Sequence, residues 1–292
     1  MHSVDNGSVS VDHYENFPVA SDLCPPALRP AISAIYGFAR TADDLADEGD
    51  APASERLADL AAYRADLEAI VAGHSPSQRW VHVFEPLRAA ITAHRLPVRL
   101  LADLLSAFEQ DVVKHSYADR AELLDYCRRS ANPVGRLLLH LYGIDDAHAL
   151  AQSDAICTAL QLANFWQDMS IDTRNGRVYP PASDCGRHGA APADLLARHD
   201  SAAVHALVSD LVTWTRRLMA EGAPLVHAIP GRAGWELRLV VQGGSRILDK
   251  IEALDFATLG VRPKLHWYDA PSMLWQAVRM RPSRTRIASE SA

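Results

Sequence analysis

The strongest constraint on the fold is a helical sequence pattern that runs through nearly the whole chain. Ala, Leu, Arg, Asp and Glu dominate the pattern, and the alternation of β-branched residues that is typical of strands is scarce. Prolines and glycines fall mostly between the expected helices, which we place at residues 26–48, 54–72, 79–93, 97–115, 120–142, 146–173, 203–220 and 233–256. The pattern therefore predicts an all-α protein.

The expected helices follow one another without an interior linker of low complexity and without an internal repeat. The length of 292 residues suits one large domain or two small ones. We predict a single helical domain over residues 13–278, between a flexible N-terminus at 1–12 and a flexible basic tail at 279–292. The longest irregular piece, "YPPASDCGRHGAAPADL" (residues 179–195), connects two helices and is a candidate lid.

Composition excludes several classes of function. The net charge of −7 provides no broad basic face, so we expect no nucleic-acid partner. Neither GxGxxG nor GxxxxGK[ST] occurs, which leaves a nucleotide site unsupported. The cysteines, Cys24, Cys127, Cys157 and Cys185, form no CxxC pair, and no apolar run approaches about 18 residues. These features favour a cytoplasmic protein with reduced thiols and no membrane-spanning helix.

An acidic run, "ARTADDLADEGD", follows directly on the apolar stretch "AISAIYGFA". At 100° per residue, one helical face carries Tyr36, Arg40, Asp44 and Asp47, with Asp43 just beside them. Like charges at i, i+4, as in Asp43 and Asp47, repel each other on an isolated helix. Three such acids beside an apolar run need a compensating cation.

A second stretch, "QLANFWQDMSID", repeats this arrangement of polar side chains. Its positions i, i+3, i+7 and i+11 are Gln161, Asn164, Asp168 and Asp172, which form one polar stripe. Apolar residues fill much of the remaining helix surface. A polar stripe on an otherwise apolar helix is typical of a polar cavity inside a bundle.

Both clusters supply oxygen atoms without His or Cys, which favours a hard cation such as Mg²⁺. Arg40, and Arg177 just after the second cluster, are suited to the remaining charge of a polyphosphate. A single acidic helix end is more often solvated than metal-bound, and Glu48 and Asp50 keep that interpretation. The occurrence of two clusters favours a metal site.

The two acidic stretches and several other segments resemble motifs of the squalene/phytoene synthase family. "DDLAD" and "QLANFWQDMSID" are similar to its two aspartate-rich motifs, about 120 residues apart as in this family. "YGFAR", "YCRRSANPVG" and "NGRVYPP" are similar to its other blocks, and "HYENF" is similar to its N-terminal His-x-x-Ser-Phe segment with Asn16 in place of Ser. The motifs occur in the family's order and span about residues 13 to 260.

This resemblance implies an isoprenoid-synthase helical bundle with a central cavity and an isoprenoid diphosphate as substrate. "HYENFPVAS", "ADDLADEGD" and "SANPVGR" are most similar to family members that form hydroxysqualene in bacterial hopanoid biosynthesis. For such a member, Mg²⁺ assists ionisation of presqualene diphosphate, the cyclopropylcarbinyl cation rearranges, and water captures it. The same resemblance implies functional coupling to a presqualene diphosphate synthase.

The resemblance also implies roles for individual residues. Mg²⁺ would be held by Asp43, Asp44, Asp47, Asp168 and Asp172, with Gln161 and Asn164 completing or orienting the shell. Diphosphate oxygens would contact Arg40, Arg177 and Tyr179, with Asp111 as an acid nearby. Tyr36 and Tyr126 would lie near the carbocation, where an aromatic face stabilises positive charge. His13, Asn16 and Phe17 would lie at the substrate pocket.

One block departs from the family pattern. The family's Val-Ala-Gly is Ser130-Ala131-Asn132 here, followed by Pro133. Polar Ser130 and Asn132 would be suited to holding the quenching water in an otherwise dry pocket. Alternatively, Asn132 ends or kinks the helix ahead of Pro133. The sequence leaves both interpretations open.

Three functions are compatible with these motifs. The first is the water-quenching reaction; the second is head-to-head condensation of two farnesyl or geranylgeranyl diphosphates to presqualene diphosphate, squalene or phytoene, which needs the same metal residues. The third is a catalytically silent partner subunit, which the retained aspartates oppose because clustered like charges cost stability. Poor solubility of a 30-carbon product also suggests peripheral contact with the inner face of a membrane.

Overall fold

The computed structural model describes residues 24–280, and every regular element in that range is helical. The only β feature there is an isolated parallel bridge between Ser116 and Val178. This confirms the predicted all-α class. None of the described helices is long and apolar enough to cross a membrane. All four cysteines are buried and unbridged, as expected of reduced thiols.

The chain forms ten helices of ten or more residues within the described range: α1 (Arg29–Asp47), α2 (Ala53–Val71), α3 (Val81–His94), α4 (Val98–Val113), α5 (Arg120–Ser130), α6 (Asn132–Leu141), α7 (Ala147–Asp172), α10 (Ala202–Gly222), α11 (Gly231–Ala253) and α12 (Ala270–Arg279). Shorter helices connect them: η1 (Thr173–Asn175), α8 (Ala182–His188), α9 (Pro192–Leu196), η2 (Ala223–His227) and η3 (Trp267–Asp269).

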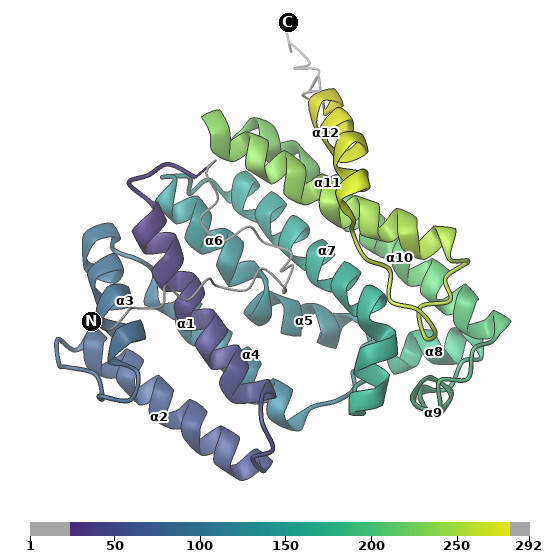
Figure 1. The fold of residues 1–292 in the computed structure, drawn as a ribbon, viewed down its shortest axis with the longest axis horizontal. Coiled ribbons are helices and arrows are strands. Elements are labelled where there is room, and N and C mark those ends of the chain that lie inside the picture. Colours follow the sequence, from purple (N-terminus) through teal and green to yellow (C-terminus); the bar gives the residue numbers. More distant parts are fainter. Residues whose placement is uncertain (1–23, 281–292) are drawn as a thin grey trace, which may run out of the picture.

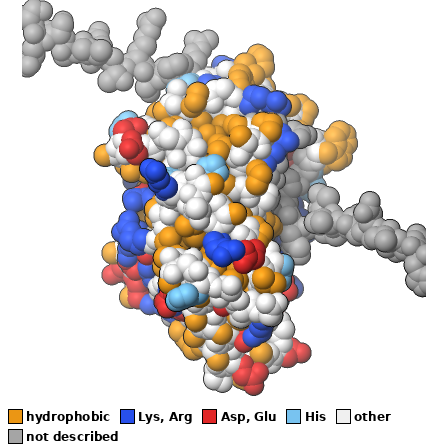
Figure 2. All heavy atoms as spheres, turned by 90° about the vertical axis from the view of Figure 1, so that its left-hand side faces the viewer, with side chains coloured by type: hydrophobic (Ala, Val, Ile, Leu, Met, Phe, Trp, Pro, Cys, Tyr) orange, Lys and Arg blue, Asp and Glu red, His pale blue; other side chains and the backbone are white. Residues whose placement is uncertain are grey.

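Helix α7 occupies the middle of the bundle (Figure 1). It packs against α6, α10 and α11, whereas α1 packs against α2, α3 and α4. The helices α1 and α7 therefore belong to two packed groups. The group with α2 and α3 forms the face shown in Figure 2, where acidic and basic side chains are interspersed with apolar ones.

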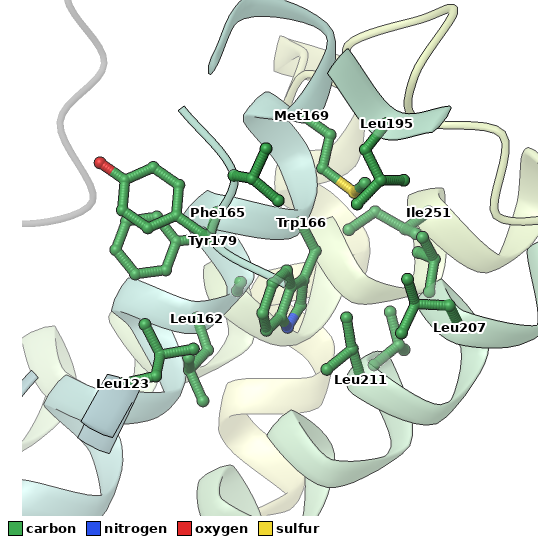
Figure 3. Packing of buried hydrophobic residues seen from close by; sticks show 14 of the residues in the cluster. Leu123, Leu162, Phe165, Trp166, Met169, Tyr179, Leu195, Leu207, Leu211 and Ile251 are labelled. Carbon is green, nitrogen blue, oxygen red and sulfur yellow. The ribbon is translucent and has the colours of Figure 1, made fainter. Parts of the chain in front are cut away.

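The orientation of α7 about its own axis is fixed by Trp166. This side chain is fully buried, and its Nε1–H donates a hydrogen bond of 2.8 Å to Thr215 Oγ1 of α10. Leu162, Leu211 and Ile251 pack around it (Figure 3). Burying this face against α10 and α11 turns the polar stripe of α7 in another direction.

The orientation of α1 is fixed in the same way by Phe38. Phe38 is fully buried and stacks on Tyr63 of α2 with ring centroids 5.4 Å apart. The Tyr63 hydroxyl donates to the Phe38 carbonyl at 3.1 Å. Arg40 and Asp43 lie on the opposite side of α1, since two and five residues at 100° each give rotations of about 200° and 140°. The packed face thus directs both residues away from the core.

The structure corrects three expected segments. The predicted helix 120–142 is two helices, because α5 ends at Ser130 and α6 begins at Asn132 with Pro133 in its first turn. The segment 179–195, predicted to be irregular, contains α8 and all of α9 except its last residue. Helix α12 was not expected, since its ten residues are shorter than the periodic windows from which a helix is inferred.

Candidate active site

A cavity of about 700 Å³ lies among α1, α6, α7 and α11. Most of its wall is apolar, with contributions from Ile32, Ile35, Leu138, Leu139, Ile156, Leu160, Leu225, Ile229, Leu237, Val240 and Leu265. At 1.5 Å per residue, the lining positions of α7 from Ile156 to Asp168 extend over about 18 Å. The cavity therefore suits a long apolar ligand.

One end of this cavity is polar. Helix α1 contributes Tyr36, Arg40 and Asp43, while α7 contributes Gln161, Asn164, Gln167 and Asp168. Arg262 and Lys264, from the segment after α11, complete this end. The two acidic stretches, about 120 residues apart in the sequence, thus meet at one place. A ligand with a polyanionic head and a long apolar body matches this distribution.

Arg40 neutralises the first acidic stretch from within α1. Its guanidinium lies 3.3 Å from Asp43 Oδ2, 2.8 Å from Asp44 Oδ1 and 3.0 Å from Glu48 Oε1. The Glu48 side chain is still 65% exposed, as the sequence indicated for the end of this helix. The charge repulsion inferred from the spacing of the acids is therefore compensated in part by the arginine one turn earlier.

Arg177 connects the end of α1 to the end of α7. Its Nη1 donates to Asp47 Oδ2 at 3.0 Å, and its backbone N–H donates to the Asp172 carbonyl at 2.9 Å. The side chains of Arg177 and Asp47 are 20% and 37% exposed, so this bidentate pair is partly shielded from water. The predicted diphosphate residue Arg177 thus lies beside acids of both clusters.

Arg262 holds the second acidic stretch. Its Nη2 donates to Asp168 Oδ2 at 3.0 Å, and its Nε donates to Asp168 Oδ1. The neighbouring backbone is fixed, because buried Gln167 donates from Nε2 to the Pro263 carbonyl at 2.8 Å. A segment far along the chain is thereby attached to the polar end of the cavity.

Two carboxyl groups in this region have strongly raised pKa values. Burial, followed by the nearby charges of Asp168 and Asp47, raises the pKa of Asp172 to about 7. Burial also raises the pKa of Asp111 to about 7, although the Tyr126 hydroxyl donates to Asp111 Oδ2 at 2.8 Å. Since Asp47 acts on both groups, the acids of the two helices lie within electrostatic reach of one another.

The donor set fits a hard divalent cation shared with a ligand. In the described range, no three carboxylate, imidazole or thiol side chains lie close enough to hold a metal ion by themselves. Asp47 and Asp168 instead point their carboxylates at Arg177 and Arg262. Mg²⁺ commonly takes only one or two carboxylates and completes its octahedron with water and phosphate oxygens. The remaining carboxylates and the amide of Asn164 are oxygen donors of the required kind.

An aromatic layer supports the acids. Tyr179 stacks on Phe165 of α7, with ring centroids 3.7 Å apart and an interplanar angle of 9°. Tyr179 is held there because Val178 N donates to the His115 carbonyl at 2.8 Å. Its hydroxyl points away from the Trp166 cluster (Figure 3). Tyr126 lies next to this layer, 6.1 Å from the Phe165 ring centroid.

The predicted site residues that the structure describes fall into three groups. The cavity wall includes Tyr36, Arg40, Asp43, Gln161, Asn164 and Asp168. A network beside the polar end, outside that wall, includes Asp47, Asp111, Tyr126, Asp172, Arg177 and Tyr179, while Asp44 pairs with Arg40. His13, Asn16 and Phe17 lie outside the described residues.

Ser130 and Asn132 form the third group, because neither belongs to the cavity wall. Asn132 is buried between α6 and α7, and its Oδ1 accepts a hydrogen bond of 3.0 Å from Thr158. It also begins α6, which agrees with a break ahead of Pro133. The structural interpretation of Asn132 thus has a direct contact in its favour, and a role in holding water stays a prediction.

Sequence reasoning missed Gln167, Arg262 and Lys264. Gln167 adjoins the recognised stripe but lies off its i, i+3, i+7 positions, so helical spacing gave no reason to select it. Arg262 and Lys264 flank Pro263 in a segment without periodicity, 94 residues beyond Asp168 in the case of Arg262. The one signal in the sequence of this segment is that a cationic residue stands on each side of the proline.

The sequence matches the family model for squalene/phytoene synthase over residues 11–269. The chain therefore belongs to the squalene/phytoene synthase family, as the motifs indicated.

Within this family, the chain is similar to enzymes with two different names. The chain is 37% identical to a hydroxysqualene synthase of Rhodopseudomonas palustris over 244 residues, which cover 82% of this chain and 80% of that one. It is 36% identical to a hydroxysqualene synthase of Zymomonas mobilis over 77% of this chain and 75% of that one. It is 26% identical to a presqualene diphosphate synthase of Zymomonas mobilis, over 96% of this chain and 93% of that one.

Solved structures agree with this assignment. A squalene synthase from Alicyclobacillus acidocaldarius superimposes with a TM-score of 0.76 at 37% sequence identity, covering 84% of this chain and 90% of that one. A dehydrosqualene synthase at 22% identity has a TM-score of 0.78 and shares the fold. The helical architecture is thus common to relatives whose names refer to different products.

Proposed function

We propose that this protein converts presqualene diphosphate to hydroxysqualene and diphosphate, in a Mg²⁺-dependent reaction that ends with capture of a carbocation by water. One observation carries this proposal: two acid-bearing helices converge at the polar end of a long apolar cavity. Relatives at 34–37% identity over most of the chain are named hydroxysqualene synthase, which supports this choice of reaction.

The polar end is suited to a diphosphate leaving group. Bound Mg²⁺ would act as a Lewis acid on the diphosphate as the C–O bond breaks and negative charge develops. Asp43, Asp44, Asp47, Asp168 and Asp172 are the proposed ligands, directly or through water, with Asn164 and Gln161 completing the shell. Arg40, Arg177, Arg262 and Lys264 would then neutralise diphosphate oxygens, and Tyr179 would orient them.

The cavity wall is suited to the cation that remains. Apolar side chains exclude bulk water, which would otherwise end the reaction before rearrangement. The Tyr36 ring lines the cavity beside the acids, where its face can stabilise positive charge without forming a bond. Tyr126, whose hydroxyl donates to Asp111, is proposed to act indirectly, by orienting that acid.

The second candidate function is condensation of two farnesyl diphosphates. The similarity to a presqualene diphosphate synthase over 96% of the chain favours this reaction as an alternative, and both reactions need the same metal residues. Under the first proposal the substrate comes from such a synthase, to which this enzyme would be functionally coupled in the cytoplasm or at the inner face of the membrane.

Product analysis separates the two functions. The purified protein is incubated with Mg²⁺ and either presqualene diphosphate or farnesyl diphosphate, and the products are identified by mass. We expect hydroxysqualene from presqualene diphosphate and no product from farnesyl diphosphate alone. Formation of presqualene diphosphate or of a hydrocarbon from farnesyl diphosphate would instead establish the condensing function.

A further inference from the structure

The C-terminal part of the described chain exposes an unusual concentration of large apolar side chains. Trp267 and Tyr268 of η3 are 87% and 56% exposed. Leu274, Trp275 and Val278 of α12 are 54%, 60% and 58% exposed. We refer to these five side chains as the η3–α12 surface. Exposed apolar residues are common singly, but a contiguous group usually marks an interaction site.

The η3–α12 surface belongs to a firmly held element. One side of α12 packs on α11, where Ala277 is fully buried and Met273 lies against Gly243. Arg238 of α11 donates to the carbonyls of Ala277 and Met280 at 3.2 and 2.9 Å. Leu274 and Val278 lie on the other side of α12, which is the outermost helix beyond α11 (Figure 1). Their exposure is therefore a property of the packed fold.

The base of η3 is anchored just as tightly. Buried Asp269 accepts from Arg246 Nε at 2.9 Å and pairs with Lys250 Nζ at 2.9 Å. These contacts lower the pKa of Asp269 to about 2, so its charge is retained and compensated near neutral pH. Trp267 and Tyr268 are thereby presented outward from a fixed turn.

The stretch of sequence that contains this surface has a net charge opposite in sign to that of the whole chain. Between residues 260 and 280 the cations are Arg262, Lys264 and Arg279, and the one acid is the buried Asp269. Beyond the described residues, the sequence continues with Arg281, Arg284, Arg286 and Glu290. The protein as a whole carries a net charge of −7. A partner of this surface should therefore be both apolar and anionic.

The chemical types of the exposed side chains favour a lipid interface over a protein groove. Trp and Tyr have an apolar ring and a polar atom, and they concentrate at the headgroup level of bilayers. The Arg279 guanidinium lies 5.8 Å from the Trp275 ring centroid. A cation beside an interfacial aromatic ring matches the headgroups of anionic lipids.

We propose that the η3–α12 surface docks the protein on the anionic surface of a lipid bilayer. Leu265, two residues before Trp267, lines the cavity, so the docked surface borders the wall of the proposed active site. An apolar product could then pass into lipid with little exposure to water. This consequence rests on the proposed function, whereas the docking itself does not.

Vesicle sedimentation tests the docking with the full chain. Wild-type protein should sediment with phosphatidylcholine vesicles that contain phosphatidylglycerol, less with phosphatidylcholine alone, and less at high salt, because screening weakens the attraction. The double variant Leu274→Ser/Trp275→Ser should lose at least about tenfold in vesicle affinity. The control Val71→Ser/Leu196→Ser alters exposed apolar residues elsewhere and should bind as wild type does.

Four further measurements make the outcome decisive. Circular dichroism shows whether the double variant is folded. If the variant does not fold, the wild-type protein is tested with brominated lipids instead. Quenching of its Trp fluorescence would then support docking, and absence of quenching would overturn the proposal. The variant Asp43→Asn should bind vesicles normally, which separates docking from catalysis. Equal sedimentation of wild type and double variant would overturn the proposal. So would a dimer in light scattering that the double variant converts to a monomer, since the surface would then join two copies.

Discussion

Individual arginines compensate the acids at the polar end of the cavity. Arg40 contacts Asp43 and Asp44, and Arg262 contacts Asp168. Binding of a metal–diphosphate complex would replace these contacts, because the aspartates would then contact the metal ion and the arginines would contact the diphosphate. The site is thus electrostatically preorganised for a ligand that carries both charges.

The carboxylates of the two helices should be individually essential. We predict that Asp43→Asn and Asp168→Asn each lower turnover by at least about 100-fold, because each removes an oxygen anion from the metal shell. Far-ultraviolet circular dichroism should be unchanged. Asp50→Asn, at an exposed position beyond α1, provides the matched control and should retain activity. Full activity of either site variant would refute the metal assignment.

The raised pKa of Asp172 predicts a stability effect in the metal-free protein. Its folded-state pKa, about 7, lies above the unfolded value near 3.9. The folded state therefore binds this proton more tightly, and the resulting stabilisation is complete below about pH 4 and lost as pH rises through 7. At pH 8, Asp172→Asn removes an unfavourable, partly buried charge and should stabilise the metal-free protein; the difference of about 3 between the two pKa values sets an upper limit of about 4 kcal/mol.

Thermal unfolding in a chelator checks this effect. The unfolding temperature of Asp172→Asn should exceed that of wild type at pH 8, and the difference should shrink at pH 5. Excess Mg²⁺ should remove it, because the wild-type carboxylate then has its cation. Asp145→Asn, an exposed substitution, should change neither value. A lower unfolding temperature for Asp172→Asn at pH 8 would show that its charge is stabilising in the folded protein.

Helical spacing predicted part of the site at this scale. The i, i+3, i+7 pattern placed Gln161, Asn164 and Asp168 on one side of α7, and all three line the cavity. Spacing could not identify Arg262, because no local rule connects residues 94 positions apart. It also could not show that Asp47 faces Arg177, 130 positions away, since that pair depends on how two helix ends meet.

At the scale of elements, the interruption at Ala131 is the clearest departure from the predicted helices. Proline lacks an N–H group and its ring clashes with the preceding turn, so Pro133 is tolerated at the start of α6 but would disrupt a continuous helix. The sequence contains this signal, since a break ahead of Pro133 is one of the two interpretations that it leaves open for Asn132. Helix α12 was missed for a different reason: its ten residues are shorter than the window over which helical periodicity is read from a sequence.

The contact between α6 and α7 yields a prediction for Asn132. Asn132→Ala and Thr158→Val each break the buried 3.0 Å hydrogen bond, and each should lower the free energy of unfolding by about 1–2 kcal/mol. The double variant should cost less than the sum of the two, because both substitutions remove the same interaction. The alcohol fraction of the product should not change in any of the three.

Product analysis of these variants can contradict the structural role of Asn132. A shift from alcohol to hydrocarbon in Asn132→Ala, with no shift in Thr158→Val, would mean that the Asn132 amide holds the quenching water. Denaturant unfolding and product mass are measured on the same preparations, so that loss of fold and change of product are distinguished.

At the scale of the whole molecule, two packed groups of helices enclose one elongated cavity. Trp166 fixes the orientation of α7 about its axis, and Phe38 fixes that of α1. As a result, the polar faces of both helices line the same cavity. The all-α class and the family followed from the sequence, because helical periodicity and motif order are local or linear properties. The shape of the cavity, and the return of the chain at Arg262 to close it, required the packed structure.

The central claim is that the acids of α1 and α7 share one metal–diphosphate complex. Crystals grown with Mn²⁺ in place of Mg²⁺ and a non-hydrolysable farnesyl thiodiphosphate allow the metal to be located by anomalous scattering. Our account predicts metal between the Asp43–Asp47 and Asp168–Asp172 carboxylates, with Arg177 and Arg262 turned from Asp47 and Asp168 toward the diphosphate. A diphosphate bound at the polar end without metal at these carboxylates, or metal bound only elsewhere, would contradict it.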